Sequence, residues 1–224
     1  MERPERILDV SSIMMELFPT LNEVYCFKFL SRWYHKDYKL EDMQEIVYHD
    51  HNHIFAVVIN ANKIAIQMNL PKEERQILFI AALFHDYGHS YGRETDTYNI
   101  TNAISELYAM QTSYAWLLDV PHHIIDAAAD AILCTIYPFR IRPKTTVECI
   151  LRDADLTMSL EPDAEVFAEG LQNEIRRKHP DVVITKETMA QFAKEQRFYT
   201  IECAQLFGFN YAYRFKTDKP KTQE

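Results

Sequence analysis

Hydrophobic positions recur at helical spacing along most of the chain. In the segments 6–18 and 23–35, apolar residues lie three and four positions apart, which is the spacing of one face of an α-helix. The region 41–68 contains at least one long helix, predicted by an apolar stripe of Ile54, Val57, Val58, Ala61 and Ala65. Such a stripe indicates a helix that packs one face against a core.

The next predicted helix has signals at both ends. Asn69 and Pro71 mark its entry, and Glu73 and Glu74 follow in its first turn, where acidic side chains stabilise the positive end of the helix dipole. It runs through an apolar stretch and ends near Gly88.

Further elements follow from the same spacing. Residues 87–99 are predicted to form a loop, and helices are predicted at 100–118, 122–136, 145–160, 163–178 and 187–207. One short strand is indicated at 181–185. The chain has only four glycines, and its remaining composition favours helices over sheets. We therefore expect an all-α, single-domain helical bundle over residues 1–215, and a disordered polar tail at 216–224.

The composition narrows the class of protein. Of the 224 residues, 47% are hydrophobic and 25% are charged, as in soluble globular proteins. No apolar run is long enough to cross a bilayer, and the N-terminus lacks the continuous apolar core of a signal peptide. The four cysteines form no CxxC pair, which favours reduced thiols. A cytoplasmic location is expected.

The net charge bears on the partners. A formal charge of −9 argues against sequence-independent binding to duplex nucleic acid, which relies on basic side chains that neutralise phosphates. A small anionic substrate stays open, because bound cations can reverse the local field. The oligomeric state also stays open, with a homodimer among the alternatives.

Candidate chemistry gathers where helices begin and end. His49 and His53 are four residues apart, as are His85 and His89, so each pair lies one turn apart on one helix face. The adjacent Asp86 projects in another direction and can offer a ligand to a second ion. Imidazoles and carboxylates at the end of an apolar helix are costly to bury without partners. A metal site and hydrogen-bonded core residues are the two interpretations.

Four short segments with His, Asp or Glu residues follow one another along the chain: "YHDHNH" at 48–53, "FHDYGH" at 84–89, "ISEL" at 104–107 and "DADLT" at 153–157. This arrangement resembles the HD superfamily of metal-dependent phosphohydrolases, and within it the cyclic-nucleotide phosphodiesterase branch. The resemblance runs from about Tyr48 to Thr157 and implies a helical bundle that carries its ligands on helices.

The resemblance also implies a role for each matching residue. A first metal would be held by His53, His85, Asp86 and Asp155, with Asp86 bridging to a second metal. His89 and Glu106 would serve the second metal, largely through its waters. His49 would protonate the leaving oxygen, and Gln196 would correspond to a glutamine that clamps a purine.

The chemistry fits these residue types independently. Two divalent ions can activate water and hold the phosphoryl oxygens of an ester. Mixed His and carboxylate ligands suit Zn, Fe or Mn at the first site, and a carboxylate with waters suits Mg or Mn at the second. A histidine near its normal pKa can protonate the alkoxide leaving group.

Departures from that branch leave the substrate open. Ser90, Tyr91 and Gly92 follow His89, where phosphodiesterases usually have Pro-Gly, and the chain is shorter than their catalytic domain. A small nucleotide-like anion, specifically a cyclic nucleotide or cyclic dinucleotide, is the leading substrate class. A nucleotide phosphomonoesterase and a (deoxy)nucleoside triphosphate hydrolase are alternatives on the same scaffold. A non-catalytic metal-binding sensor and an iron-dependent oxygenase are further ones.

Some residues compete with those of the motif. Asp153 lies two residues before Asp155, and the surrounding "ADLT" favours Asp155. His122 and His123 are either additional ligands or a solvated helix start. The basic stretch 139–144 either meets further phosphates or forms a solvated loop.

Overall fold

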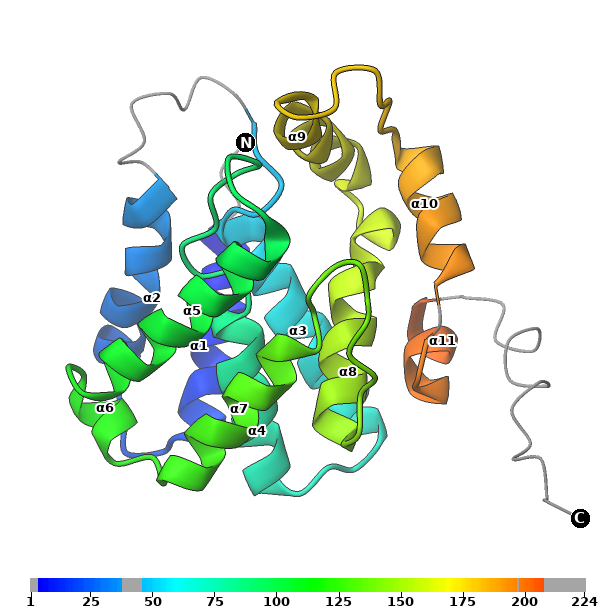
Figure 1. Ribbon diagram of the computed structural model, residues 1–224. Helices are drawn as coiled ribbons and strands as arrows, with labels where there is room; N and C mark the ends of the chain where they lie inside the picture. The colour runs from blue at the N-terminus through cyan, green and yellow to red at the C-terminus, as the bar shows by residue number, and fades with distance from the viewer. Residues whose placement is uncertain (1–3, 38–45, 197, 208–224) are drawn as a thin grey trace, which may run out of the picture.

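A computed structural model describes residues 4–37, 46–196 and 198–207 (Figure 1). Over these ranges the chain forms eleven α-helices and one 3₁₀-helix, and no strand. The prediction of an all-α bundle is therefore confirmed. The strand predicted at 181–185 is wrong, since these residues form a turn and irregular chain that leads into the next helix. The predicted tail, 216–224, lies outside the described residues.

The helices have the following bounds: α1 (Pro4–Leu17), α2 (Glu23–Asp37), α3 (His51–Gln67), α4 (Lys72–Phe84), α5 (Asp96–Gln111), α6 (Ala115–Leu118), α7 (His122–Leu133), α8 (Thr146–Asp155), η1 (Leu156–Leu160), α9 (Ala164–Arg176), α10 (Lys186–Glu195) and α11 (Ile201–Phe207).

Helix α4 forms the centre of the bundle. It packs against α3, α7 and α8, and every residue from Ile77 to Phe84 is buried. A helix that is buried on several sides reads as a continuous apolar run rather than as a stripe. The five residues of the stripe predicted for α3 are all buried as well. In Figure 1, α9, α10 and α11 lie on the side of the bundle away from α2, α5 and α6.

Several helix boundaries differ from the sequence prediction for local reasons. Helix α5 begins at Asp96 instead of 100, because the Thr95 side chain caps it by accepting the backbone N–H of Tyr98. The predicted helix 187–207 is divided, because the backbone N–H groups of Tyr199 and Thr200 donate to the Asp153 carboxylate and not to a helical carbonyl. The predicted helices 100–118 and 145–160 are likewise each divided in two.

Two glycines let α9 approach the rest of the chain closely. A Cβ atom on Gly170 would lie 2.5 Å from the carbonyl carbon of Val47. A Cβ atom on Gly92, whose φ is +80°, would overlap the carbonyl oxygen of Glu174. Backbone therefore packs on backbone at both points. The Gly170 contact brings α9 against the segment that precedes α3, and the Gly92 contact brings it against the loop between α4 and α5. Among the described residues, no helix has both the length and the apolar character needed to span a membrane.

Candidate metal centre

Four side chains from three parts of the chain converge at the buried ends of helices. His53, His85, Asp86 and Asp155 each place one ligand atom within 4.8 Å of the others. His53 lies in the first turn of α3, which Asp50 caps by accepting the N–H groups of residues 52 and 53. His85 is the C-terminal cap of α4, and Asp155 is the last residue of α8.

The distances within this group fit ligands of a common ion. His53 Nε2 lies 3.1 Å from Asp86 Oδ2 and 3.2 Å from Asp155 Oδ1. His85 Nε2 lies 2.9 Å from Asp86 Oδ2. Ligand atoms placed tetrahedrally around Zn²⁺ at their usual bond lengths are about 3.3 Å apart. The donor set therefore suits a divalent transition metal.

The hydrogen bonding of His85 strengthens that assignment. Its Nδ1 lies 2.8 Å from the carbonyl oxygen of Ala82, so Nδ1 carries the proton in the neutral ring. The Nε2 lone pair then faces His53 Nε2 at 3.1 Å as well as two carboxylates. A lone pair and two carboxylates that face one another in a buried site need a proton or a metal ion between them.

The pKa values of His85 and Asp86 also indicate that this group of side chains stabilises a positive charge. Burial alone would lower the pKa of His85, but Asp86 and Asp155 raise it well above its usual value. Burial would raise the pKa of Asp86, yet the neighbouring histidines hold it well below its usual range. The group stabilises either protons or a metal ion, and a metal ion would leave both imidazoles neutral.

A second group lies beside the first and contains His49, His89 and Glu174. Glu174 Oε1 accepts the backbone N–H groups of Tyr48 and His49 at 2.8 and 3.0 Å. Its Oε2 lies 2.6 Å from His49 Nδ1. The His49 ring stacks on the ring of His89, with centroids 3.7 Å apart. Glu174 therefore fixes both the backbone and the ring of His49.

A proton explains the contact between His49 and Glu174 better than a metal does. An N···O distance of 2.6 Å is short for an N–H···O contact, as expected of a strong charge-assisted hydrogen bond. Burial would lower the pKa of His49, but the charge of Glu174 leads the effects that raise it to about 9. His89 differs, since burial and the charge of His49 lower its pKa to about 3. The arrangement thus favours a cationic His49 and a neutral His89.

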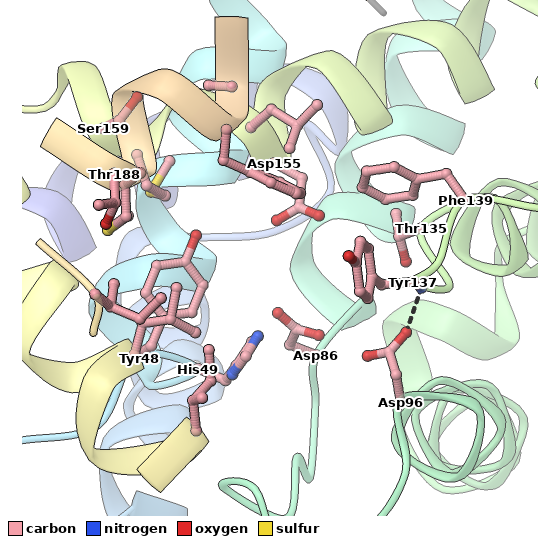
Figure 2. Close-up of a pocket in the computed structure, with 18 of the residues that line it drawn as sticks. Tyr48, His49, Asp86, Asp96, Thr135, Tyr137, Phe139, Asp155, Ser159 and Thr188 are labelled. Atoms are coloured by element: carbon pink, nitrogen blue, oxygen red, sulfur yellow. Dashed lines mark hydrogen bonds between the residues drawn. The ribbon is translucent and has the colours of Figure 1, made fainter. Parts of the chain in front are cut away.

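A pocket of about 520 Å³ opens onto both groups. Figure 2 shows the His49 imidazole pointing toward Asp86 from one side of it. Its apolar wall includes Met158, Leu171, Ile175, Ile184, Met189 and Phe192. Among the described lining residues, His49 is the only one that can carry a positive charge. The arrangement can bind a small molecule that is largely apolar away from the ions.

Two residues proposed from the resemblance lie elsewhere. Glu106 is half-buried on α5, and Gln196 is a half-buried cap at the end of α10. Neither belongs to the two ligand groups or to the described lining of the pocket. His89 does lie at the site, where Tyr91 N–H donates to its Nδ1 and its Nε2 lies 2.6 Å from Asn99 Nδ2.

The competing residues are also placed. Asp153 is buried away from the pocket and accepts hydrogen bonds from Tyr199 and Thr200. His122 and His123 are exposed on α7; the first lies near Gln111 and the second near Glu73. The basic side chains of Arg140, Arg142 and Lys144 are exposed and lie outside the described pocket lining.

The sequence interpretation missed Glu174 and Asp96. Glu174 belongs to no motif, but it lies on the apolar face of α9 that Phe167 and Leu171 define. An acidic residue on an apolar helix face indicates a buried partner. Asp96 lines the pocket from the first turn of α5, in a segment predicted to be loop.

Comparison with known proteins gives the family. Residues 30–158, more than half of the chain, match the family model of the HD domain. No curated protein and no solved structure gave a significant match. The matched segment contains His53, His85, Asp86 and Asp155, and it ends before Glu174. The chain therefore belongs to the HD-domain superfamily of metal-dependent phosphohydrolases.

Proposed function

We propose that the protein hydrolyses a small phosphodiester at a centre of two divalent metal ions. His53, His85, Asp86 and Asp155 would hold the first ion, and Asp86 would also reach the second. When bound, the ions supply a nucleophile from water and offset the charge of the phosphoryl oxygens. The observation that carries the proposal is the position of His49, which Glu174 fixes beside the same pocket as Asp86 and Asp155.

His49 is the general acid of the proposed reaction. Its Nδ1 is engaged by Glu174 at 2.6 Å, so Nε2 carries the proton that goes to the leaving oxygen. A sugar alkoxide is a poor leaving group and needs that proton. The charge of Glu174 leads the effects that raise the pKa of His49, to about 9 in the metal-free protein, and it favours the protonated imidazole. Glu174 acts through His49 and is a positioning residue.

The pocket supports a cyclic nucleotide or cyclic dinucleotide over a nucleoside triphosphate. A triphosphate carries several charges that proteins usually meet with basic side chains. The described lining of the pocket has only His49 for that purpose. The ions would meet the charge of the phosphodiester that is cleaved, which is the single charge of a cyclic nucleotide and one of the two of a cyclic dinucleotide. The wall that Ile184 and Phe192 help to form suits a flat, weakly polar base.

The test is a substrate panel with the metal-loaded protein. Bis-p-nitrophenyl phosphate, p-nitrophenyl phosphate, 3′,5′-cyclic nucleotides, cyclic dinucleotides and deoxynucleoside triphosphates are compared at equal concentration. We expect hydrolysis of diesters and of at least one cyclic compound. Hydrolysis of p-nitrophenyl phosphate without the diesters would replace the proposal by a phosphomonoesterase.

A His49→Gln variant separates the acid role from metal binding. p-Nitrophenolate leaves without protonation, whereas a ribose oxygen does not. We therefore expect the variant to keep its metals and most of its activity on bis-p-nitrophenyl phosphate, and to lose roughly 10²- to 10⁴-fold on the cyclic substrate. Equal losses on both substrates would contradict the assignment of His49.

A further inference from the structure

The Asp96 side chain faces the metal centre from the opposite wall of the pocket. It lines that pocket together with Asp86 and Asp155. One of its oxygens, Oδ2, accepts the backbone N–H of Tyr137 at 2.5 Å. Figure 2 shows this hydrogen bond and shows the other oxygen directed across the pocket toward Asp86. The Tyr137 contact thus fixes the carboxylate and leaves Oδ1 without a hydrogen bond from the described residues.

Asp86 has a complementary free oxygen. Only 6% of its surface is exposed, and its Oδ2 contacts both His53 and His85. The other oxygen, Oδ1, makes no hydrogen bond or ion pair with the part of the chain that the structure describes. This oxygen is not among the fully buried polar atoms of the described residues, so it opens onto the pocket that Asp86 lines. Two unpartnered oxygens, one on Asp86 and one on Asp96, therefore border the same pocket.

The charges around Asp96 also call for a cation. Burial raises the pKa of Asp96 to about 6, and the charges of Asp86 and Asp155 add to that increase. No described Lys or Arg lines the pocket, and Glu174 already engages the ring of His49. The Tyr137 N–H and the charge of His49 offset part of this increase, but no described basic side chain forms an ion pair with the Asp96 carboxylate.

Glu106 lies too far along α5 to bind a cation beside Asp86 and Asp96. It follows Asp96 on the same helix by ten residues, a rise of about 15 Å along the helix axis. It also lies outside the described pocket lining. His89, the other residue considered for the second ion, has both ring nitrogens within hydrogen-bond distance of Tyr91 or Asn99.

We propose that Asp96 is the protein carboxylate, besides Asp86, that binds the second divalent cation directly or through its waters. The inference rests on the proposed two-metal function, and it assigns to Asp96 the role at the second ion that the resemblance implied for Glu106. Oxygen ligands with several retained waters suit Mg²⁺ or Mn²⁺.

The test is a titration of the metal-free protein with Mn²⁺. Binding is monitored by calorimetry and by the electron paramagnetic resonance signal of free Mn²⁺. Asp96→Asn is compared with Glu106→Gln. The asparagine oxygen can still accept the Tyr137 N–H, so the loop contact remains. We expect two ions for the wild type and for Glu106→Gln. For Asp96→Asn we expect the affinity for the second ion to be 10- to 100-fold lower and the affinity for the first ion to be unchanged.

Other outcomes overturn the inference. A single Mn²⁺ in the wild type, or two ions of unchanged affinity in Asp96→Asn, would contradict it. Thermal unfolding of the metal-free proteins checks that the variant is folded. If Asp96→Asn is unfolded, Asp96→Glu is titrated instead, and its second ion must bind more weakly than that of the wild type. Two bound ions without diesterase activity would remove the proposed function and leave the role of Asp96 standing.

Discussion

His49 Nδ1 lies 2.6 Å from Glu174 Oε2, a contact between residues 125 positions apart. Glu174 also accepts the backbone N–H of His49, so one carboxylate sets both the position and the charge of the imidazole. It comes from α9, beyond the segment that matches the HD-domain model. The proposed acid therefore depends on a helix outside the matched region.

Glu174→Gln is expected to lower the diesterase rate by roughly 10- to 100-fold on a cyclic substrate. A general acid acts only when protonated, so activity falls as the pH rises through the pKa of His49. That pKa is about 9 without bound ions and lower when ions offset the charges of Asp86 and Asp155. Removing the negative charge of Glu174 lowers that pKa. The alkaline limb of kcat/KM against pH should therefore move to lower pH.

The pH profile distinguishes positioning from a loss of folded protein. A merely structural role for Glu174 would lower the rate at all pH values and leave the alkaline limb where it is in the wild type. The Glu174 contribution to the pKa of His49 persists when bound ions offset Asp86 and Asp155, so the shift should be visible in the metal-loaded enzyme.

Substitutions of Asp153 and Asp155 are expected to affect different properties, stability in the first case and metal binding in the second. Asp153→Ala removes the acceptor of the Tyr199 and Thr200 N–H groups, which should cost about 1–3 kcal/mol of unfolding free energy and leave metal content intact. Asp155→Ala should remove a metal ligand and abolish turnover. Denaturant unfolding and elemental analysis of both variants check this. Metal loss in Asp153→Ala with none in Asp155→Ala would reverse the assignment.

Gly170→Ala tests the close approach of α9. The added methyl group would meet the Val47 backbone at 2.5 Å, so either α9 or the segment before α3 must move. We expect a loss of about 1–3 kcal/mol in stability together with a lower kcat, because His49 and Glu174 separate. Glu169→Ala, at an exposed neighbouring position of the same helix, is the control. A wild-type rate in Gly170→Ala would show that this packing does not position the acid.

Phe192 and Gln196 provide a matched pair at the end of α10. Phe192 lines the pocket and Gln196 does not. Phe192→Ala should raise KM about tenfold, because burying an aromatic side chain against a ligand contributes about 1.5–3 kcal/mol. Gln196→Ala should change KM less than twofold. A large effect of Gln196→Ala alone would restore the purine-clamp hypothesis.

The core and the motif order could be read from the sequence because both are local. The apolar run 77–84 indicates a buried helix, and each of the four segments is only a few residues long. The helix boundaries at 96 and 196 were missed because side chains set them, through the Thr95 cap and through the carboxylate of Asp153.

Glu174 and Asp96 could not be assigned from spacing. Glu174 reaches His49 only because Gly170 lets α9 pack on the Val47 backbone. Asp96 is aimed by the Tyr137 N–H, 41 residues away in the chain. Tertiary packing sets both positions, and the spacing of residues along the sequence does not report on it.

The most direct test measures metal content and bis-p-nitrophenyl phosphate hydrolysis together, on wild type and Asp86→Ala purified without chelator. The account predicts bound divalent metal and diesterase activity in the wild type, and at least one ion fewer with no turnover in Asp86→Ala. A wild-type protein without bound metal that also fails to gain activity on addition of Mn²⁺, Zn²⁺ or Mg²⁺ would contradict it.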